Sequence, residues 1–169
     1  MDPMQLLLRG LQLLWIVLLT ALIGNVIVLN INGAMAAINF SMFVIVVSWL
    51  ACLFGLFVAL VQRFDIPGKA LFIADIVASL FTFIGAVVLA AKLRAVNCAD
   101  TADWGEGWIA YGSLNDTKRC REIQASAVFM WFLFGTFVAG LVLSWLGFRR
   151  SGGSVMSAGP SMSQFRGGV

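Results

Sequence analysis

The sequence predicts an all-α membrane protein, a bundle of four transmembrane helices, on three observations. The chain has 169 residues, of which 61% are apolar and only 11% are charged, whereas soluble domains average about 25% charged residues. A stretch of 53 residues between Arg9 and Arg63 contains no charged side chain. Apolar runs long enough to span a bilayer recur four times, and they are continuous rather than alternating, which favours helices over membrane β-strands.

The four expected helices follow these apolar runs in chain order. At 1.5 Å rise per residue, each run can cross about 30 Å of hydrocarbon with some tilt. The Gly- and Ser-rich C-terminal segment has the composition of a flexible tail. The predicted helices span residues 6–29, 38–61, 70–91 and 123–148, which places a membrane domain at 1–148, its longest loop at 92–122 and the tail at 149–169.

The N-terminal apolar run has an alternative interpretation as a secretory signal. The residues Ala34-Met35-Ala36 resemble the small-residue site at which signal peptides are cleaved. The apolar run before this site is about 20 residues long, whereas signal cores usually have about 7–15. This length favours a retained first helix, and the mass of the intact protein distinguishes the two.

Two features of the 92–122 loop predict which side of the membrane it faces. The numbers of Lys and Arg on the two sides are nearly equal, so the positive-inside rule gives no decision. Cys98 and Cys120 flank the loop, and a disulfide between them would persist only in an oxidising compartment, although two free thiols are the alternative. Asn115-Asp116-Thr117 is an N-glycosylation acceptor sequence. Both features predict an extracellular loop and cytoplasmic termini.

Several segments of the chain resemble the fungal non-classical export protein 2 family of MARVEL-type tetraspans. The resemblance lies in Asp75-Ile76-Val77, Phe81-Thr82-Phe83, Gly85–Ala90, Arg94-Ala95-Val96-Asn97-Cys98 and Arg119-Cys120-Arg121-Glu122-Ile123-Gln124-Ala125. It implies a plasma-membrane protein of fungal furrow domains that associates with eisosomes and their scaffold. The resemblance also implies a response to sphingolipid, clustering in sterol-rich membrane and a connection with unconventional secretion.

Asp75 is the ionisable residue that the pattern places deepest inside a predicted helix. Such groups usually face the bundle interior, because burial in lipid is costly. Asp75, Ser79 and Thr82 share one face of the third helix by their spacing. We expect Gln12 to be a nearer polar partner of Asp75 than Asn25, because Gln12 lies at a similar depth. A packing role is favoured over a proton or ion pathway, which would need further relay groups.

Small residues recur at helical spacing in the second and fourth helices. Such stripes let helix backbones approach closely, either within the bundle or between copies of the chain. Packing within the bundle is the simpler interpretation, and an oligomer is the alternative. The stripe in the second helix comprises Ser48, Cys52, Gly55 and Ala59, and the one in the fourth comprises Gly135, Thr136, Ala139, Gly140 and Ser144.

Aromatic and basic residues near the ends of the helices are candidates for contact with lipid headgroups. Trp and Tyr favour the interfacial region, and Lys and Arg favour anionic lipids of the inner leaflet. The candidates for outer-leaflet contact are Trp104, Trp108 and Tyr111, and those for inner-leaflet contact are Arg63, Lys69, Arg149 and Arg150.

No catalytic constellation, metal-ligand cluster or phosphate-binding loop is recognisable in the sequence, and the chain has no histidine. We therefore expect a non-enzymatic protein without a cofactor or metal, and one that does not bind nucleic acid. The leading hypothesis is a tetraspan that organises membrane microdomains through lipid contacts and lateral association with itself or with other membrane proteins. The alternatives are a small transporter or channel component that uses Asp75, and an accessory subunit of a larger complex.

Overall fold

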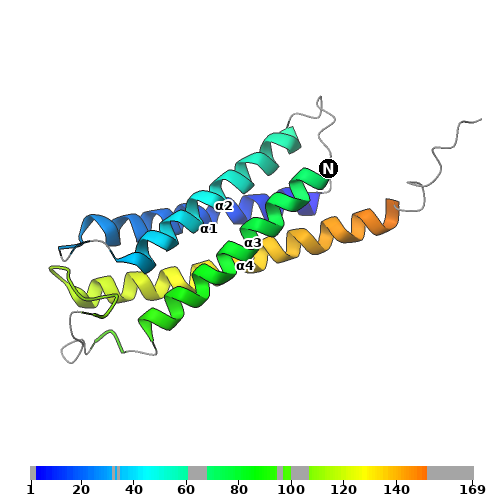
Figure 1. Ribbon diagram of the computed structural model, residues 1–169. Coiled ribbons are helices and arrows are strands. Elements are labelled where there is room, and N and C mark those ends of the chain that lie inside the picture. Colours follow the sequence, from blue (N-terminus) through cyan, green and yellow to red (C-terminus); the bar gives the residue numbers. More distant parts are fainter. Residues whose placement is uncertain are drawn as a thin grey trace, which may run out of the picture.

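The computed structural model describes residues 3–31, 33, 35–60, 68–94, 97–99 and 107–151, and in these residues the regular structure consists of four α-helices (Figure 1). Each helix is long and apolar enough to cross a membrane. The predicted class of a four-helix membrane bundle is therefore confirmed. The helices are α1 (Pro3–Val28), α2 (Ala36–Leu60), α3 (Gly68–Leu93) and α4 (Asp116–Ser151).

The helices form a ring in which chain neighbours are also neighbours in space. α1 packs against α2 and α4, and α3 packs against the same two helices. Within the described residues, α1 and α3 have no close backbone approach, so they lie diagonally across the bundle. The start of α1, the end of α2, the start of α3 and the end of α4 lie at one end of the bundle, here called the tail end (Figure 1). The opposite end, here called the loop end, carries the α1–α2 connection and the segment before α4.

The first three helices begin and end within three residues of their predicted limits, but α4 begins at Asp116 instead of 123. Its start is set by side chains that satisfy free backbone N–H groups, as helix caps do. The Asn115 Oδ1 accepts a hydrogen bond from the Lys118 N–H at 3.0 Å, and the Asp116 Oδ1 accepts one from the Ser113 N–H at 2.9 Å. The low hydropathy of the turns from Asp116 onward predicts that they belong to the loop. They are helical because the capping side chains stabilise an earlier start of α4.

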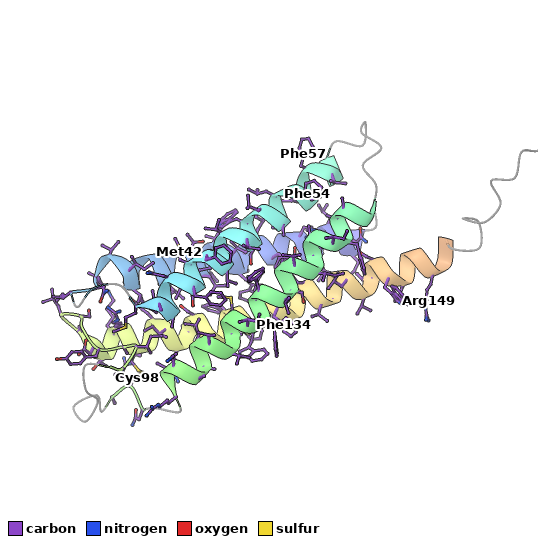
Figure 2. All side chains as sticks on the ribbon, viewed as in Figure 1. Met42, Phe54, Phe57, Cys98, Phe134 and Arg149 are labelled. Atoms are coloured by element: carbon purple, nitrogen blue, oxygen red, sulfur yellow. A yellow bond between two sulfur atoms is a disulfide. The ribbon has the colours of Figure 1, made fainter. Side chains whose placement is uncertain are left out.

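Apolar side chains cover the outside of the bundle as well as filling its centre. Ile16 and Leu19 of α1 and Phe137 of α4 are fully buried. On the outer surface, Leu50 and Phe57 of α2 are more than half exposed, and Figure 2 shows Phe57 directed away from the bundle. A helix that is apolar on all sides fits a lipid environment, where the outer face needs no polar groups.

A disulfide between Cys98 and Cys120 closes the loop end. Its two Cα atoms are 5.6 Å apart and the cysteines are 22 positions apart in the chain. Cys120 lies in the second turn of α4, and Cys98 follows α3 at the loop end (Figure 2). The bond therefore ties the segment after α3 to the start of α4. Cys52, the third cysteine, is a buried free thiol in α2.

We predict that replacing both Cys98 and Cys120 with Ala lowers the free energy of unfolding by about 3 kcal/mol, because the 22-residue closed loop limits the freedom of the unfolded chain. The free energy of unfolding is measured by SDS titration in mixed micelles, for the wild type and the variant, with and without a reductant. Cys52→Ala is the control, and its stability should still fall on reduction. Equal stability of the oxidised and reduced wild-type protein would contradict the prediction.

Candidate functional site

A buried ion pair connects the two diagonal helices near the tail end. Arg9 of α1 donates from Nη2 to the Asp75 Oδ2 at 2.6 Å and from Nη1 to the Asp75 Oδ1 at 2.8 Å. Arg9 is 6% exposed and Asp75 is 2% exposed. The two parallel hydrogen bonds give the paired geometry in which Arg binds carboxylates most strongly. The charges neutralise each other, so the pair adds no net charge to the interior.

Small residues of α2 form one wall around the guanidinium group. A Cβ atom added at Gly55 would lie 2.6 Å from the Arg9 Cζ, closer than two such atoms can approach. One turn earlier, the Cys52 thiol donates to the backbone carbonyl oxygen of Arg9 at a sulfur–oxygen distance of 3.7 Å. The part of the α2 stripe that includes Cys52 and Gly55 therefore makes room for Arg9.

The α4 side of the pair is occupied by Gln12. Its Oε1 accepts a hydrogen bond from the Arg9 Nη1 at 2.9 Å, and its Nε2 donates to the Thr136 backbone oxygen at 3.4 Å. A cavity of about 20 Å³ beside this cluster is lined by Gly140 and Ser144 of α4, among others. This volume is enough for about one water molecule. All four helices thus contribute to the surroundings of the pair.

The environment of Asp75 agrees with part of the prediction and extends it. Asp75, Ser79 and Thr82 are buried on one face of α3, as their spacing predicts. Gln12 belongs to the Asp75 cluster through Arg9, whereas Asn25 donates to the Glu122 Oε1 near the loop end. Sequence reasoning missed Arg9 as the direct partner. The signal that could have found it is that Arg9 and Asp75 lie at similar distances from the starts of α1 and α3, two helices that run in the same direction.

In the described part of the chain, the buried charged side chains are Arg9 and Asp75 near the tail end and Arg119 at the loop end. The Thr82 hydroxyl donates to the Ala78 backbone oxygen in its own helix. Further toward the loop end, the buried positions of the four helices include Leu19, Ala86, Leu89 and Met130. In the described part of the chain, no cluster of three His, Cys, Asp or Glu side chains could hold a metal ion. This arrangement can fix helix packing, and it lacks the relay groups of a proton path.

The small-residue stripes are largely used inside the bundle. Ser48, Cys52 and Gly55 are buried, so the described part of the α2 stripe faces the interior of the bundle. The side chain of Ala59 lies outside the described residues. On α4, Thr136 and Gly140 contact Gln12, and Ala139 and Ser144 are half-buried. Gly135 differs, because it is exposed and a Cβ there would meet nothing within 4 Å.

A second buried cation, which the sequence analysis did not identify, lies at the loop end. Arg119 of α4 is 3% exposed. Its Nη1 donates to the Asn30 Oδ1 at 3.1 Å and its Nε to the Ile109 backbone oxygen at 3.4 Å. The Ile31 N–H donates to the Gly112 oxygen at 2.9 Å. These contacts attach the α1–α2 connection to the segment before α4.

The expected contact of Trp108 with the outer leaflet is wrong. Trp108 is 6% exposed, and its Nε1 donates to the Leu93 backbone oxygen at 3.2 Å. The buried indole therefore satisfies a backbone carbonyl in the last turn of α3. A Trp near the end of a predicted helix looks the same in the sequence whether its ring contacts lipid or caps a helix. The sequence alone therefore cannot distinguish the two positions. Tyr111 is half-buried, and Trp104 lies outside the described residues.

The expected inner-leaflet residues are described only in part. Arg149 is exposed, with its guanidinium carbon 5.5 Å from the centre of the Trp145 ring, and Figure 2 shows it at the tail end of α4. Arg63, the tail after residue 151, and the side chains of Lys69 and Arg150 lie outside the described residues. Asn115, the candidate glycosylation site, is exposed at the start of α4.

Comparison with known proteins agrees with this architecture. The family model for the MARVEL membrane-associating domain matches residues 3–143. The chain is 32% identical over 92 residues to non-classical export protein 2 of Saccharomyces cerevisiae, a match that covers 54% of this chain and 51% of the relative. The chain thus spans about half the length of this curated relative. No solved structure matches the chain.

We predict that Gly55→Ala destabilises the bundle by about 1–3 kcal/mol, because the added methyl group must displace a guanidinium that Asp75 holds in place. The loss should shrink when Arg9 and Asp75 are both replaced with Ala. Unfolding in mixed micelles measures both values. The matched control is Gly135→Ala, where the methyl group meets open space. If Gly55→Ala destabilises the wild type and the variant without Arg9 and Asp75 by the same amount, the predicted clash with the Arg9 guanidinium is refuted.

Proposed function

We propose, from the premise that this chain belongs to the MARVEL membrane-associating domain family, that it is a non-enzymatic tetraspan that organises membrane microdomains. Family members are generally membrane proteins without catalytic activity. The proposed role is structural: the bundle presents a fixed apolar surface to lipid and to neighbouring membrane proteins. A role in non-classical export, to which the name of the yeast relative refers, is proposed as a consequence of that organisation.

The observation that carries this proposal is the closed Arg9–Asp75 pair. The intramembrane charges are bonded to each other, and small residues of α2 and α4 surround them. The outer surface is apolar, with side chains such as Leu50, Phe57 and Phe132 at least half exposed. A polar interior used for packing and an apolar exterior used for contact suit a membrane organiser better than a transporter.

The proposed location is the plasma membrane, in furrow or eisosome domains, with both termini cytoplasmic. Support for this orientation comes from the loop end, where the Cys98–Cys120 disulfide requires an oxidising compartment. The exposed Asn115 sequon is at the same end. In an antiparallel four-helix bundle, both termini are then on the opposite, reducing side.

The proposed partners are sphingolipid, sterol and anionic inner-leaflet lipids, together with further copies of this chain or other membrane proteins. An eisosome scaffold is a further proposed partner on the cytoplasmic side. Among the stripe residues on α4, Gly135 is exposed beside Trp131, which is 41% exposed. We propose that lateral contacts use this side of α4, because Gly135 is exposed there and Trp131 remains partly exposed although it packs against Phe83 of α3.

We predict that the protein reconstituted in liposomes carries no proton or ion flux above that of empty liposomes, because the ion pair is closed within the core. In cells, a fluorescent fusion should cluster in furrow-like patches. The variant Arg9→Gln/Asp75→Asn should cluster like the wild type, since it removes both charges together and leaves no unpaired charge in the bundle.

The same experiments distinguish the alternative functions. Flux that disappears in Arg9→Gln/Asp75→Asn would contradict the organiser and favour a transporter or channel component. A fixed stoichiometry with one large partner would instead favour an accessory subunit. Asp75→Asn alone is unsuitable as a test of flux, because it leaves the buried guanidinium of Arg9 without its counter-charge.

A further inference from the structure

The loop end of the bundle contains three neighbouring cavities, two of which are lined by Arg119. A cavity of about 160 Å³ and one of about 240 Å³ are both lined by Arg119 and by Val26 of α1. A third, of about 300 Å³, shares Asn115, Lys118 and Glu122 with the first. The first and the third lie between α1 and the start of α4, and the second lies between the end of α1 and the start of α2. This region is separate from the Arg9–Asp75 pair at the tail end.

Arg119 has hydrogen-bonding capacity left over for a ligand in these cavities. Its two hydrogen bonds go to uncharged oxygens, those of the Asn30 side chain and the Ile109 backbone. Its Nη2 group has no protein partner in the described part of the chain. No fully enclosed polar atom is left without a hydrogen bond among the described residues, so the Nη2 group is partly accessible, and Arg119 lines two of the cavities. A cation that is 97% buried without a directly bonded carboxylate is costly unless an anion accompanies it.

Among the described residues, the two carboxylates in the first two turns of α4 each have another hydrogen-bond partner. The first two turns of α4 contain three cations, Lys118, Arg119 and Arg121, against Asp116 and Glu122. The Asp116 Oδ1 accepts from the Ser113 N–H. The Glu122 Oε1 accepts from the Asn25 Nδ2 at 2.7 Å and lies 3.7 Å from the Lys118 Nζ. The surplus is positive, and it lies at the N-terminus of a long helix, which also favours anions.

The walls of the cavities indicate the kind of anion. Lys118 and Arg121 line the largest cavity together with Leu22 of α1 and Ala125 of α4, which lie one turn further into the bundle. Leu29, also beside the cavities, is 38% exposed. Cations at the start of α4, next to apolar residues one turn further into the bundle, are complementary to a molecule with an anionic headgroup and hydrocarbon tails. Arg and Lys both bind phosphate, the Arg through paired N–H groups and the Lys as a point charge.

We propose that Arg119 and Lys118, which line one cavity together, bind the phosphate of a lipid headgroup, with Arg121 beside it in the adjoining cavity and the acyl chains in the groove between α1 and α4. The site deepens the proposed function by naming a lipid ligand and its residues, and it depends on that function only in placing the loop end at a leaflet surface. Asn115 lines two of the cavities, so a glycan attached there would lie at their mouth.

The test compares three probes against purified full-length protein in detergent, freed of N-linked glycans. Phosphatidic acid carries both the phosphate and the tails, diacylglycerol carries the same tails without phosphate, and inorganic phosphate lacks tails. Native mass spectrometry or a thermal shift gives each dissociation constant. We expect phosphatidic acid to bind at least tenfold more tightly than either of the other probes.

The exposed cations provide variants that should still fold. Lys118→Gln/Arg121→Gln should weaken phosphatidic acid binding at least tenfold, because it removes two of the three cations without touching a buried contact. Arg119→Lys keeps the buried charge and loses the paired N–H geometry, so it should also weaken binding. Lys92→Gln is the matched control, since Lys92 is an exposed cation in the last turn of α3 and is not among the residues that line these cavities.

Three results would overturn the proposal. Equal affinity for diacylglycerol would indicate an apolar groove without a phosphate site. Equal affinity for inorganic phosphate would indicate a site for free anions, with no role for the lipid tails. Unchanged binding in Lys118→Gln/Arg121→Gln would remove these cations from the site. Because binding is measured in detergent, its failure is independent of whether the protein clusters in cells.

Discussion

The bundle depends on one interaction, the ion pair between Arg9 and Asp75. It joins the two helices that do not otherwise approach each other, so it acts across the diagonal of the ring. A buried ion pair contributes little net stability, because both groups lose their water. Its effect is on specificity, since a displaced or rotated α1 or α3 would leave a charge unpaired in lipid. We infer that the pair selects the register of the two diagonal helices.

The surrounding residues follow from this constraint. A guanidinium group in the centre of a four-helix bundle needs space, and Gly55 provides it on the α2 side. Gln12 uses the remaining hydrogen-bonding capacity and links α1 to the α4 backbone at Thr136. At the loop end, the buried cation is held differently. Arg119 donates to two neutral oxygens, and the Cys98–Cys120 disulfide lies at the same end of the bundle. The two ends therefore differ in chemistry: one is closed by opposite charges, and at the other the first two turns of α4 carry three cations against two carboxylates.

The four helices and the interior position of Asp75 could be predicted from the sequence, because both depend on local patterns of apolar residues and on spacing. The partner of Asp75 could not be predicted in the same way. Arg9 lies near the end of its helix, where Arg side chains normally extend to the headgroups. Only the three-dimensional register shows that its guanidinium turns inward. The burial of Trp108 and Arg119 could not be predicted for a related reason, because an amphipathic or charged residue near an interface can be either exposed or buried. The early start of α4 was missed because capping by Asn115 outweighs the low hydropathy of the turns after it.

The most direct test of this account is a double-mutant cycle on Arg9 and Asp75, with the free energy of unfolding measured by SDS titration in mixed micelles. Arg9→Met and Asp75→Asn should each lose about 3–5 kcal/mol, because each leaves the other group buried without its partner. The double variant should lose less than either single variant, and it should retain the helix content of the wild type. Losses that simply add in the double variant would show that the two side chains act independently, and would contradict the central role of the pair.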